Sequence, residues 1–314
     1  MGPNFFIAGA PKAGTTSLYH NLRQHPQVYM SPVKEPAYFA AEARVENFTP
    51  TLQPKMRSAM ERLQFCIRQG RVADNQVRGI VADEADYLQL FSGVREERAI
   101  GEASVCYLWS QTAPAAIART VPQAKIILIL RHPAERAFSQ YLHYLSDGHV
   151  AHSFKRHIQL GLQPGDGIGY THPFLEYGLY ASQVERYLAC FPHTQVRIWL
   201  YEETVTRPSV FLREVFEFLE VDAAFVPDST RRYHRMQIPR SPGAIQWLRR
   251  TPALQFVKKN CPSALRPLWK RTMYLPRKSV KIGPEERCFL INHYREDIHN
   301  LQRILDRDLS TWMV

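Results

Sequence analysis

A glycine-bounded loop near the start of the chain carries residue types that bind phosphate. Residues 9–19 read GAPKAGTTSLY, and the separation of Gly9 and Gly14 matches the P-loop pattern G-x-x-x-x-G-K-[ST]. The lysine departs from that pattern, because it stands inside the loop at Lys12 and Thr15 takes its usual place. Backbone N–H groups of such a loop and of the helix after it bind anions. Further donors are the Lys12 ammonium group and the hydroxyls of Thr15, Thr16 and Ser17.

The displaced lysine bears on which phosphate the loop would bind. In nucleoside triphosphatases the terminal lysine contacts the β- and γ-phosphates, and a strand-end aspartate helps to hold Mg²⁺. Here the clearest strand ends in Arg131, and only Glu202 or Glu203, after a different strand, could replace that aspartate. The loop therefore suits a nucleotide that has no γ-phosphate. The simpler interpretation is a strand-to-helix turn with a chance lysine.

A second motif, RHPAERAFSQY at residues 131–141, places an arginine and a serine about two helical turns apart. Because a guanidinium group gives bidentate recognition of phosphate, Arg131 and Ser139 could hold a separate phosphate. Taken alone, the two residues favour the simpler interpretation of a surface arginine and an ordinary helical serine.

Two glutamates are candidates for a general base. Glu35 lies in KEPAYF, residues 34–39, next to Lys34 and ahead of two aromatic residues. A partly desolvated carboxylate there could accept a proton, although most such glutamates are simply solvated. Glu102, in the sequence GEAS, is the second candidate, and a structural role is favoured for it.

Short apolar runs alternate with helical patterns along the chain. Strands are predicted at residues 3–10, 99–108, 125–131 and 196–203, and helices at residues 15–25, 54–70, 114–121, 132–145, 181–191, 208–221 and 283–305. Residues 146–176 are rich in Gly, His and Pro and are predicted to form a long loop, which could line an acceptor pocket. This alternation indicates a three-layer α/β/α fold with a mainly parallel central sheet. Ligands of such sheets bind at the carboxyl ends of the strands.

Composition narrows the class of protein. The chain has 314 residues, and its 45% hydrophobic and 22% charged content is ordinary for a globular domain. It has no apolar run of about 18 residues that would suggest a membrane-spanning helix, and its start has no basic region typical of a signal peptide. Five scattered cysteines without a CxxC pair predict reduced thiols and a cytoplasmic location. The histidines at 149, 152 and 157 fit no common zinc pattern, so no metal is expected.

The positive charge is concentrated in one segment. Residues 231–281 contain 14 Lys and Arg and no acidic residue, which leaves 40 − 14 = 26 basic against 29 acidic residues elsewhere. Aromatic and aliphatic residues lie between these cations. A scaffold that also attracts cofactor phosphates is the first interpretation, and an amphipathic surface for anionic lipid is the second. An anionic glycan acceptor is a third. Single-stranded nucleic acid would also suit such a stretch, but no nucleic-acid-binding module accompanies it.

Taken together, the motifs resemble those of the sulfotransferases that use 3′-phosphoadenosine 5′-phosphosulfate (PAPS). The resemblance rests on PKAGTTSLY, KEPAYF, RHPAERAFSQY, YEETVTRPSVFLREVFEFLEV and YREDIHNLQRILDRDLSTWM, which occur in this order from about residue 4 to 314. It is nearest to bacterial members and to the carbohydrate, heparan-type branch. The pairing of PKxGTTSLY with RxPxxRAxSxY is much more specific than either motif alone.

The resemblance implies a role for each motif. Lys12 would contact the oxygen that bridges phosphorus and sulfur, while Ala13, Gly14, Thr15, Thr16 and Ser17 would hold the 5′-phosphate. Arg131 and Ser139 match the family's 3′-phosphate pair, and Glu35 matches the catalytic glutamate of the carbohydrate branch. YHRMQIPRS, residues 233–241, resembles the late loop that closes over the nucleotide, with Arg240 and Ser241 as candidate contacts.

The carbohydrate branch often has a lysine directly after the glutamate that corresponds to Glu102. Ala103 stands there in this chain, and Lys34 could take the place of that lysine. The late-loop stretch YHRMQIPRS also has no asparagine, a residue common in the family's late loop.

The sequence therefore predicts a single sulfotransferase domain over residues 1–314, with a P-loop NTPase-like α/β/α fold. It would move a sulfuryl group from PAPS to an acceptor hydroxyl of a carbohydrate, lipid or natural product, and an amine is also open. One alternative is a P-loop nucleotide kinase or NTPase, which would need Mg²⁺ and the missing lysine. The other is a non-catalytic basic protein that binds membranes or nucleic acid, with peripheral membrane contact through residues 231–281.

Overall fold

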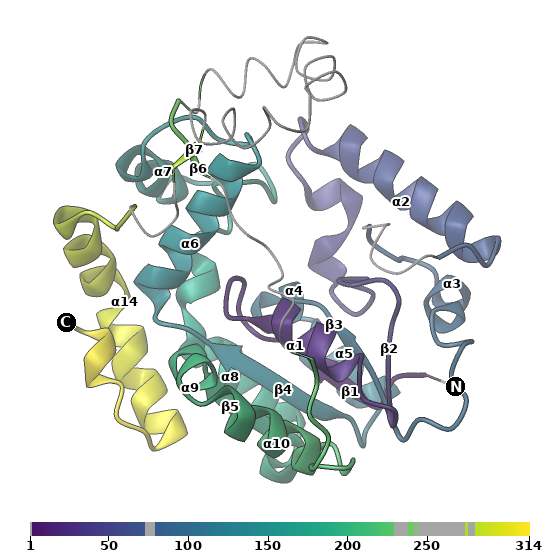
Figure 1. Cartoon of the computed structure of the whole chain (residues 1–314). Helices are drawn as coiled ribbons and strands as arrows, with labels where there is room; N and C mark the ends of the chain where they lie inside the picture. The colour runs from purple at the N-terminus through teal and green to yellow at the C-terminus, as the bar shows by residue number, and fades with distance from the viewer. Residues whose placement is uncertain (1, 73–78, 229–237, 242, 244–273, 276–279) are drawn as a thin grey trace, which may run out of the picture.

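The structure is a computed structural model, and it describes residues 2–72, 79–228, 238–241, 243, 274–275 and 280–314. Its centre is a sheet of five parallel strands in the order β2-β3-β1-β4-β5. The strands are β1 (Phe5–Ile7), β2 (Val28–Met30), β3 (Ala99–Ala103), β4 (Lys125–Leu130) and β5 (Val196–Leu200). Helices flank this sheet (Figure 1), so the expected P-loop-like α/β fold with a parallel central sheet is confirmed.

The helices connect and cover these strands. They are α1 (Thr15–Leu22), α2 (Gln53–Arg68), α3 (Glu84–Gln89), α4 (Cys106–Trp109), α5 (Ala113–Thr120), α6 (Pro133–Ser146), α7 (Phe154–Gly161), α8 (Tyr180–Cys190), α9 (Tyr201–Thr206), α10 (Pro208–Phe218) and α14 (Pro284–Leu305). Short 3₁₀ helices occur at Ala41–Ala43, Val45–Asn47, Glu176–Gly178, His193–Gln195 and Ser310–Trp312. A separate two-stranded antiparallel sheet joins β6 (Ile238–Pro239) to β7 (Tyr274–Leu275).

The core explains why the apolar runs become central strands. The three residues of β1 are fully buried, and in β4 only Lys125 is partly exposed. Strand β1 pairs with β3 on one side and β4 on the other, so Phe5 lies opposite both Gly101 and Lys125. A strand covered on both faces has no need of alternating polar residues. The long final helix α14 packs against α6 and α8 and is shown in yellow in Figure 1.

Several details differ from the sequence-based prediction. The predicted strand at residues 99–108 ends at Ala103, and helix α4 covers Cys106–Trp109. Val28–Met30 forms an additional strand, β2, next to β3. Residues 146–176 are not one long loop, because they contain helix α7, whose start is capped by the Ser153 side chain accepting from the Arg156 N–H at 3.3 Å. The predicted strand at residues 196–203 ends at Leu200, and α9 begins at Tyr201.

Across the described parts of the chain, no helix combines the length and the apolar composition needed to cross a bilayer. Within the same residues, no group of three or more His, Cys, Asp and Glu side chains is arranged to hold a metal ion.

Candidate anion and transfer site

The loop between β1 and α1 is held in a conformation that few residues adopt. Lys12 has a φ of 68° and Gly14 a φ of 88°, both in the left-handed region. A side chain at Gly9 would place its Cβ 2.8 Å from the backbone nitrogen of Ile129 in β4, so only glycine allows this close approach. The Ala13 N–H donates to the Ala10 carbonyl at 3.2 Å, which closes the loop on itself.

Helix α1 begins at the end of this loop. Gly14 precedes the helix and has no side chain to cap it, and the first turn consists of Thr15, Thr16 and Ser17 without an acidic residue. Thr15 is buried, Thr16 is half-buried and Ser17 is exposed. The first N–H groups of a helix carry partial positive charge and attract anions. The predicted anion loop is therefore a folded feature of the chain, with hydroxyls at the helix start.

Arg131 connects this loop to the end of β4. One of its guanidinium nitrogens donates to the Lys12 carbonyl at 2.9 Å, and the guanidinium lies 4.7 Å from the centre of the Tyr201 ring. The Arg131 carbonyl in turn accepts from the hydroxyl of Tyr180 at 2.9 Å. The arginine predicted to face the ligand edge of the sheet thus contacts the loop that holds Lys12.

Arg131 and Ser139 line one cavity of about 360 Å³. Ser139 reaches it from α6 and is buried. The cavity wall is completed by Glu135, Phe138, Leu142, Val280, Lys281, Ile282 and Arg287. Three cationic side chains meet here, and only Arg131 was predicted to do so. Lys281 ends the basic segment 231–281, and Arg287 comes from α14.

The charges around this cavity are fixed by neighbouring groups. Arg287 pairs with the Glu135 carboxylate at 2.6 Å. The backbone N–H of His132 donates to a carboxylate oxygen of Glu202 at 3.0 Å, which joins the end of β4 to α9. Burial, with the positive charges of Arg287 and Arg131, lowers the pKa of His132 to about 4. His132 is therefore neutral at pH 7, and the positive charge of the cavity comes from the arginines and Lys281.

Glu35 follows β2 and also has a left-handed backbone, with a φ of 67°. Its N–H donates to the Ala103 carbonyl at the end of β3 at 2.8 Å. Its carboxylate pairs with the Lys34 ammonium group at 2.5 Å, and the two side chains are 46% and 10% exposed. The Glu35 carboxylate is therefore accessible, whereas the Lys34 side chain is largely buried.

The other predicted residues have different environments. Glu102 is fully buried and accepts hydrogen bonds from three hydroxyl groups. Arg240 and Ser241 are exposed and follow β6, which packs against α6, the helix that carries Ser139. Most of the segment predicted as the late loop, residues 233–237, lies outside the described residues.

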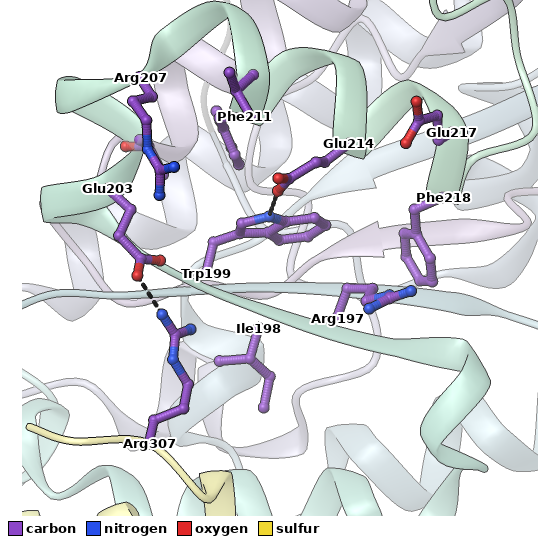
Figure 2. Close-up of a pocket in the computed structure, with 12 residues that line it drawn as sticks. Arg197, Ile198, Trp199, Glu203, Arg207, Phe211, Glu214, Glu217, Phe218 and Arg307 are labelled. Carbon is purple, nitrogen blue, oxygen red and sulfur yellow. Dashed lines mark hydrogen bonds and ion pairs between the residues drawn. The ribbon is translucent and has the colours of Figure 1, made fainter.

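A larger cavity of about 610 Å³ lies along the edge strand β5 (Figure 2). Of the candidate residues named from the sequence, its lining includes only Glu203, which was considered as a replacement for a magnesium-binding aspartate. Its walls come from β5, α9, α10 and Arg307. Two of its carboxylates have partners within it, because Glu214 accepts from the Trp199 indole N–H at 2.8 Å and Glu203 pairs with Arg307. Of these two cavities, only the smaller one is lined by Arg131 and Ser139, the residues predicted to hold a separate phosphate.

Comparisons with known proteins point to one family. Residues 3–225 match a family model described as "Sulfotransferase family". Carbohydrate sulfotransferase 15 of Rattus norvegicus is 26% identical over 252 residues, which cover 70% of this chain and 44% of the rat protein. The human bifunctional heparan sulfate N-deacetylase/N-sulfotransferase 3 is 33% identical over 223 residues, covering 70% of this chain and 22% of that protein.

A solved structure agrees with this result over the whole chain. The sulfotransferase from Alicyclobacillus acidocaldarius superposes with a TM-score of 0.72 at 29% identity and covers 100% of both chains. The curated relatives named above are much longer, and this chain spans less than half of their length.

Proposed function

This chain belongs to the sulfotransferase family, and from that premise we propose that it transfers a sulfuryl group from PAPS to an acceptor, with a glycan first among the acceptor classes. Two relatives with sulfotransferase names, one for carbohydrate and one for heparan sulfate, support the glycan. A lipid or natural-product hydroxyl and an amine are the remaining acceptors. The cytoplasmic location and the membrane contact through residues 231–281 stay predictions.

The observation that carries the proposal is the placement of Arg131. A single side chain contacts the anion loop at the Lys12 carbonyl and lines the cavity that contains Ser139. A donor with a 5′-phosphosulfate and a 3′-phosphate needs two anion sites at a fixed separation. In the proposal, the loop and the start of α1 bind the 5′ group, and Arg131, Ser139 and Lys281 bind the 3′-phosphate.

The proposed chemistry uses side chains of this chain. Lys12 stabilises the negative charge that develops on the bridging oxygen as the sulfur–oxygen bond breaks, since preorganised cations are most effective where charge appears in the transition state. Glu35 accepts the proton of the acceptor group, and Lys34 forms an ion pair with the Glu35 carboxylate beside it. Lys12 supplies the charge that a metal ion would otherwise supply, so the proposal asks for none.

A transfer assay with a matched pair of variants tests the proposal. Purified protein would be supplied with PAPS and a panel of glycan acceptors, and both the sulfated product and 3′-phosphoadenosine 5′-phosphate (PAP) would be measured. We expect Glu35→Gln to lower kcat by about 10² to 10⁴, the usual contribution of a general base. Glu46→Gln changes an exposed glutamate in a 3₁₀ turn and should keep the wild-type rate. Equal rates for the two variants would remove Glu35 from the mechanism.

A second outcome concerns the class of the enzyme. Glu202 lies just after β5, next to the end of β4, where a kinase could place a magnesium ligand. Phosphoryl transfer from Mg-ATP without transfer from PAPS would therefore favour a P-loop kinase over a sulfotransferase.

A further inference from the structure

Glu102 is a fully buried carboxylate near the carboxyl end of β3, 0% exposed, with a hydrogen-bond donor set built around it. The hydroxyls of Tyr107 and Tyr87 donate to one of its oxygens, at 2.7 and 2.9 Å, and the Ser104 hydroxyl donates to the other at 2.7 Å. Burial raises the pKa of Glu102 to about 7, while the three hydroxyls and the charge of Lys34 favour its ionised form. A buried carboxylate is costly to the fold unless it is hydrogen-bonded in this way.

Two of these hydroxyls also contact the turn that carries Glu35. The Ala37 N–H donates to the Ser104 oxygen at 3.1 Å, and the Phe39 N–H donates to the Tyr107 oxygen at 3.2 Å. Because each hydroxyl gives its proton to Glu102, its lone pairs are left to accept from the backbone. The Glu35 N–H donates in addition to the Ala103 carbonyl. Every second residue of the turn, from Glu35 to Phe39, therefore donates its N–H to a residue between 103 and 107.

The turn needs such support because its backbone is unfavourable. Glu35 has a φ of 67° and Ala37 a φ of 55°. Residues with a Cβ avoid this region, and they remain there only where the surroundings over-determine the conformation. The hydroxyls that donate to Glu102 supply part of this support, because those of Ser104 and Tyr107 accept hydrogen bonds from the turn.

We propose that Glu102 is a positioning residue, which orients the Ser104 and Tyr107 hydroxyls so that residues 35–39 keep the backbone that presents Glu35 to the acceptor. The inference rests on the proposed function of Glu35. Glu102 is itself shielded from the acceptor by its burial, and it acts through the turn.

Two tyrosines provide a matched test of this role. Tyr107 and Tyr87 are both buried and donate to the same oxygen of Glu102, but only the Tyr107 hydroxyl also accepts an N–H of the turn. Tyr107→Phe and Tyr87→Phe each remove one hydroxyl and keep the ring. A purely structural network would respond to both changes, whereas a positioning network responds mainly to Tyr107→Phe. Ser104→Ala, which removes the Ala37 contact, should behave like Tyr107→Phe.

We would measure kcat and KM for PAPS in glycan sulfation, and the hydrogen exchange of the backbone N–H groups of Glu35, Ala37 and Phe39. Tyr107→Phe and Ser104→Ala should lower kcat by about 10- to 100-fold with little change in KM, because a small misplacement of a reacting group is costly. The Ala37 and Phe39 amides should exchange faster in these variants. Tyr87→Phe should stay close to wild type in both measurements, and Glu102→Gln, if it folds, should match Tyr107→Phe.

The two measurements separate this inference from the proposed function. A wild-type protein that transfers nothing from PAPS would contradict the proposed function, but the exchange of the turn amides would still test the positioning. Similar exchange and similar kcat in Tyr107→Phe and Tyr87→Phe would overturn the inference, as would thermal destabilisation by both variants without any loss of kcat.

Discussion

At the scale of single residues, the two proposed catalytic side chains share an unusual backbone. Lys12 and Glu35 both have positive φ values although neither is glycine. Such conformations cost on the order of 1–3 kcal/mol each and cluster at active sites. In this chain each is held by specific hydrogen bonds, from the Arg131 side chain to the Lys12 carbonyl and from the Glu35 N–H to the Ala103 carbonyl. The strained backbone at these two positions is consistent with the catalytic roles proposed for their side chains.

The proposed role of Lys12 gives a prediction about rate and affinity. Lys12→Ala should lower kcat by about 10² to 10³, the usual effect of losing one group that stabilises transition-state charge. The affinity for PAP should fall much less, because the partner charge develops only as the reaction proceeds. Steady-state kinetics with PAPS and calorimetric titration with PAP would measure the two quantities.

The control for this variant is Lys55→Ala, which removes an exposed lysine from α2. Its kcat and its affinity for PAP should both equal those of the wild type. If Lys12→Ala instead loses rate and affinity in equal measure, Lys12 binds the ground state and has no special role in the transition state.

The sequence predicts some of these residues much better than others. Arg131 and Ser139 come from one motif, and a strand end followed by two helical turns is enough to bring them to one cavity. Lys281 joins the same cavity from a segment more than 140 residues later. No local sequence pattern predicts such a contact, because it depends on how segments that are far apart in the sequence pack in the folded chain.

At the scale of secondary-structure elements, the final helix supports the site from outside. Asp297 of α14 accepts from the backbone N–H groups of Tyr180 and Ala181, at 2.6 and 3.1 Å, at the start of α8. A carboxylate at a helix start satisfies N–H groups that have no partner within the helix. Tyr180 in turn donates to the Arg131 carbonyl. Helix α14 is thus linked through α8 to the end of β4.

Replacing this cap should destabilise the protein in a way that depends on pH. Asp297→Ala should lower the free energy of unfolding by about 1 kcal/mol at pH 7, typical of a lost N-terminal cap. Burial raises the pKa of Asp297 from 3.8 to about 6. Between these values the native state binds more protons than the unfolded state, so the contribution of Asp297 falls as pH rises through 6. The decrease in the free energy of unfolding that Asp297→Ala causes should therefore be larger at pH 4 than at pH 7.

Urea unfolding at the two pH values measures this effect, with Glu296→Ala as the control. Glu296 is the exposed neighbour on the same helix, and its replacement should change stability little at either pH. A pH-independent loss in Asp297→Ala would contradict the raised pKa of Asp297.

Helices and strands with a clear periodic or continuous apolar pattern could be predicted from the sequence. Elements that depend on their pairing or packing with the rest of the chain could not. After Lys125, the other five of the six residues of β4 form a continuous apolar run. Strand β2 has only three residues, and its pairing with β3 defines it. Helix α7 was hidden in a Gly-rich stretch, although Phe154, His157, Ile158 and Gly161 lie on its buried face with helical spacing.

At the scale of the whole molecule, the parallel sheet assembles the site from distant parts of the sequence. The loop after β1, the turn after β2, the end of β3 and Arg131 after β4 all lie at the carboxyl ends of neighbouring strands (Figure 1). Alternation of strands and helices predicts this position for the loop after β1 and for Arg131, since parallel strands present their carboxyl ends on one edge. Strand β2 was not predicted, so the position of the turn that carries Glu35 required the structure. The order β2-β3-β1-β4-β5 required the structure, because the sequence does not state which strands are neighbours.

The charge distribution belongs to this scale as well. The segment of residues 231–281 was predicted first as scaffold that attracts cofactor phosphates. Lys281, one of its described residues, lines the cavity with Arg131 and Ser139, and the attraction of cofactor phosphates by this segment stays a prediction. Most of the segment lies outside the described residues, so its contact with anionic lipid stays a prediction.

The central claim is that the two anion sites bind one nucleotide with phosphates at both the 3′ and 5′ positions. Thermal unfolding with PAP, compared with AMP and with Mg-ATP, tests it most directly. A ligand at 100 times its Kd adds about 2.7 kcal/mol to the native state, which should raise the Tm of a chain of this size by several degrees. We predict that PAP gives this shift, that AMP gives much less, and that Arg131→Ala loses the shift. A shift with Mg-ATP alone would contradict the sulfotransferase proposal and favour a kinase.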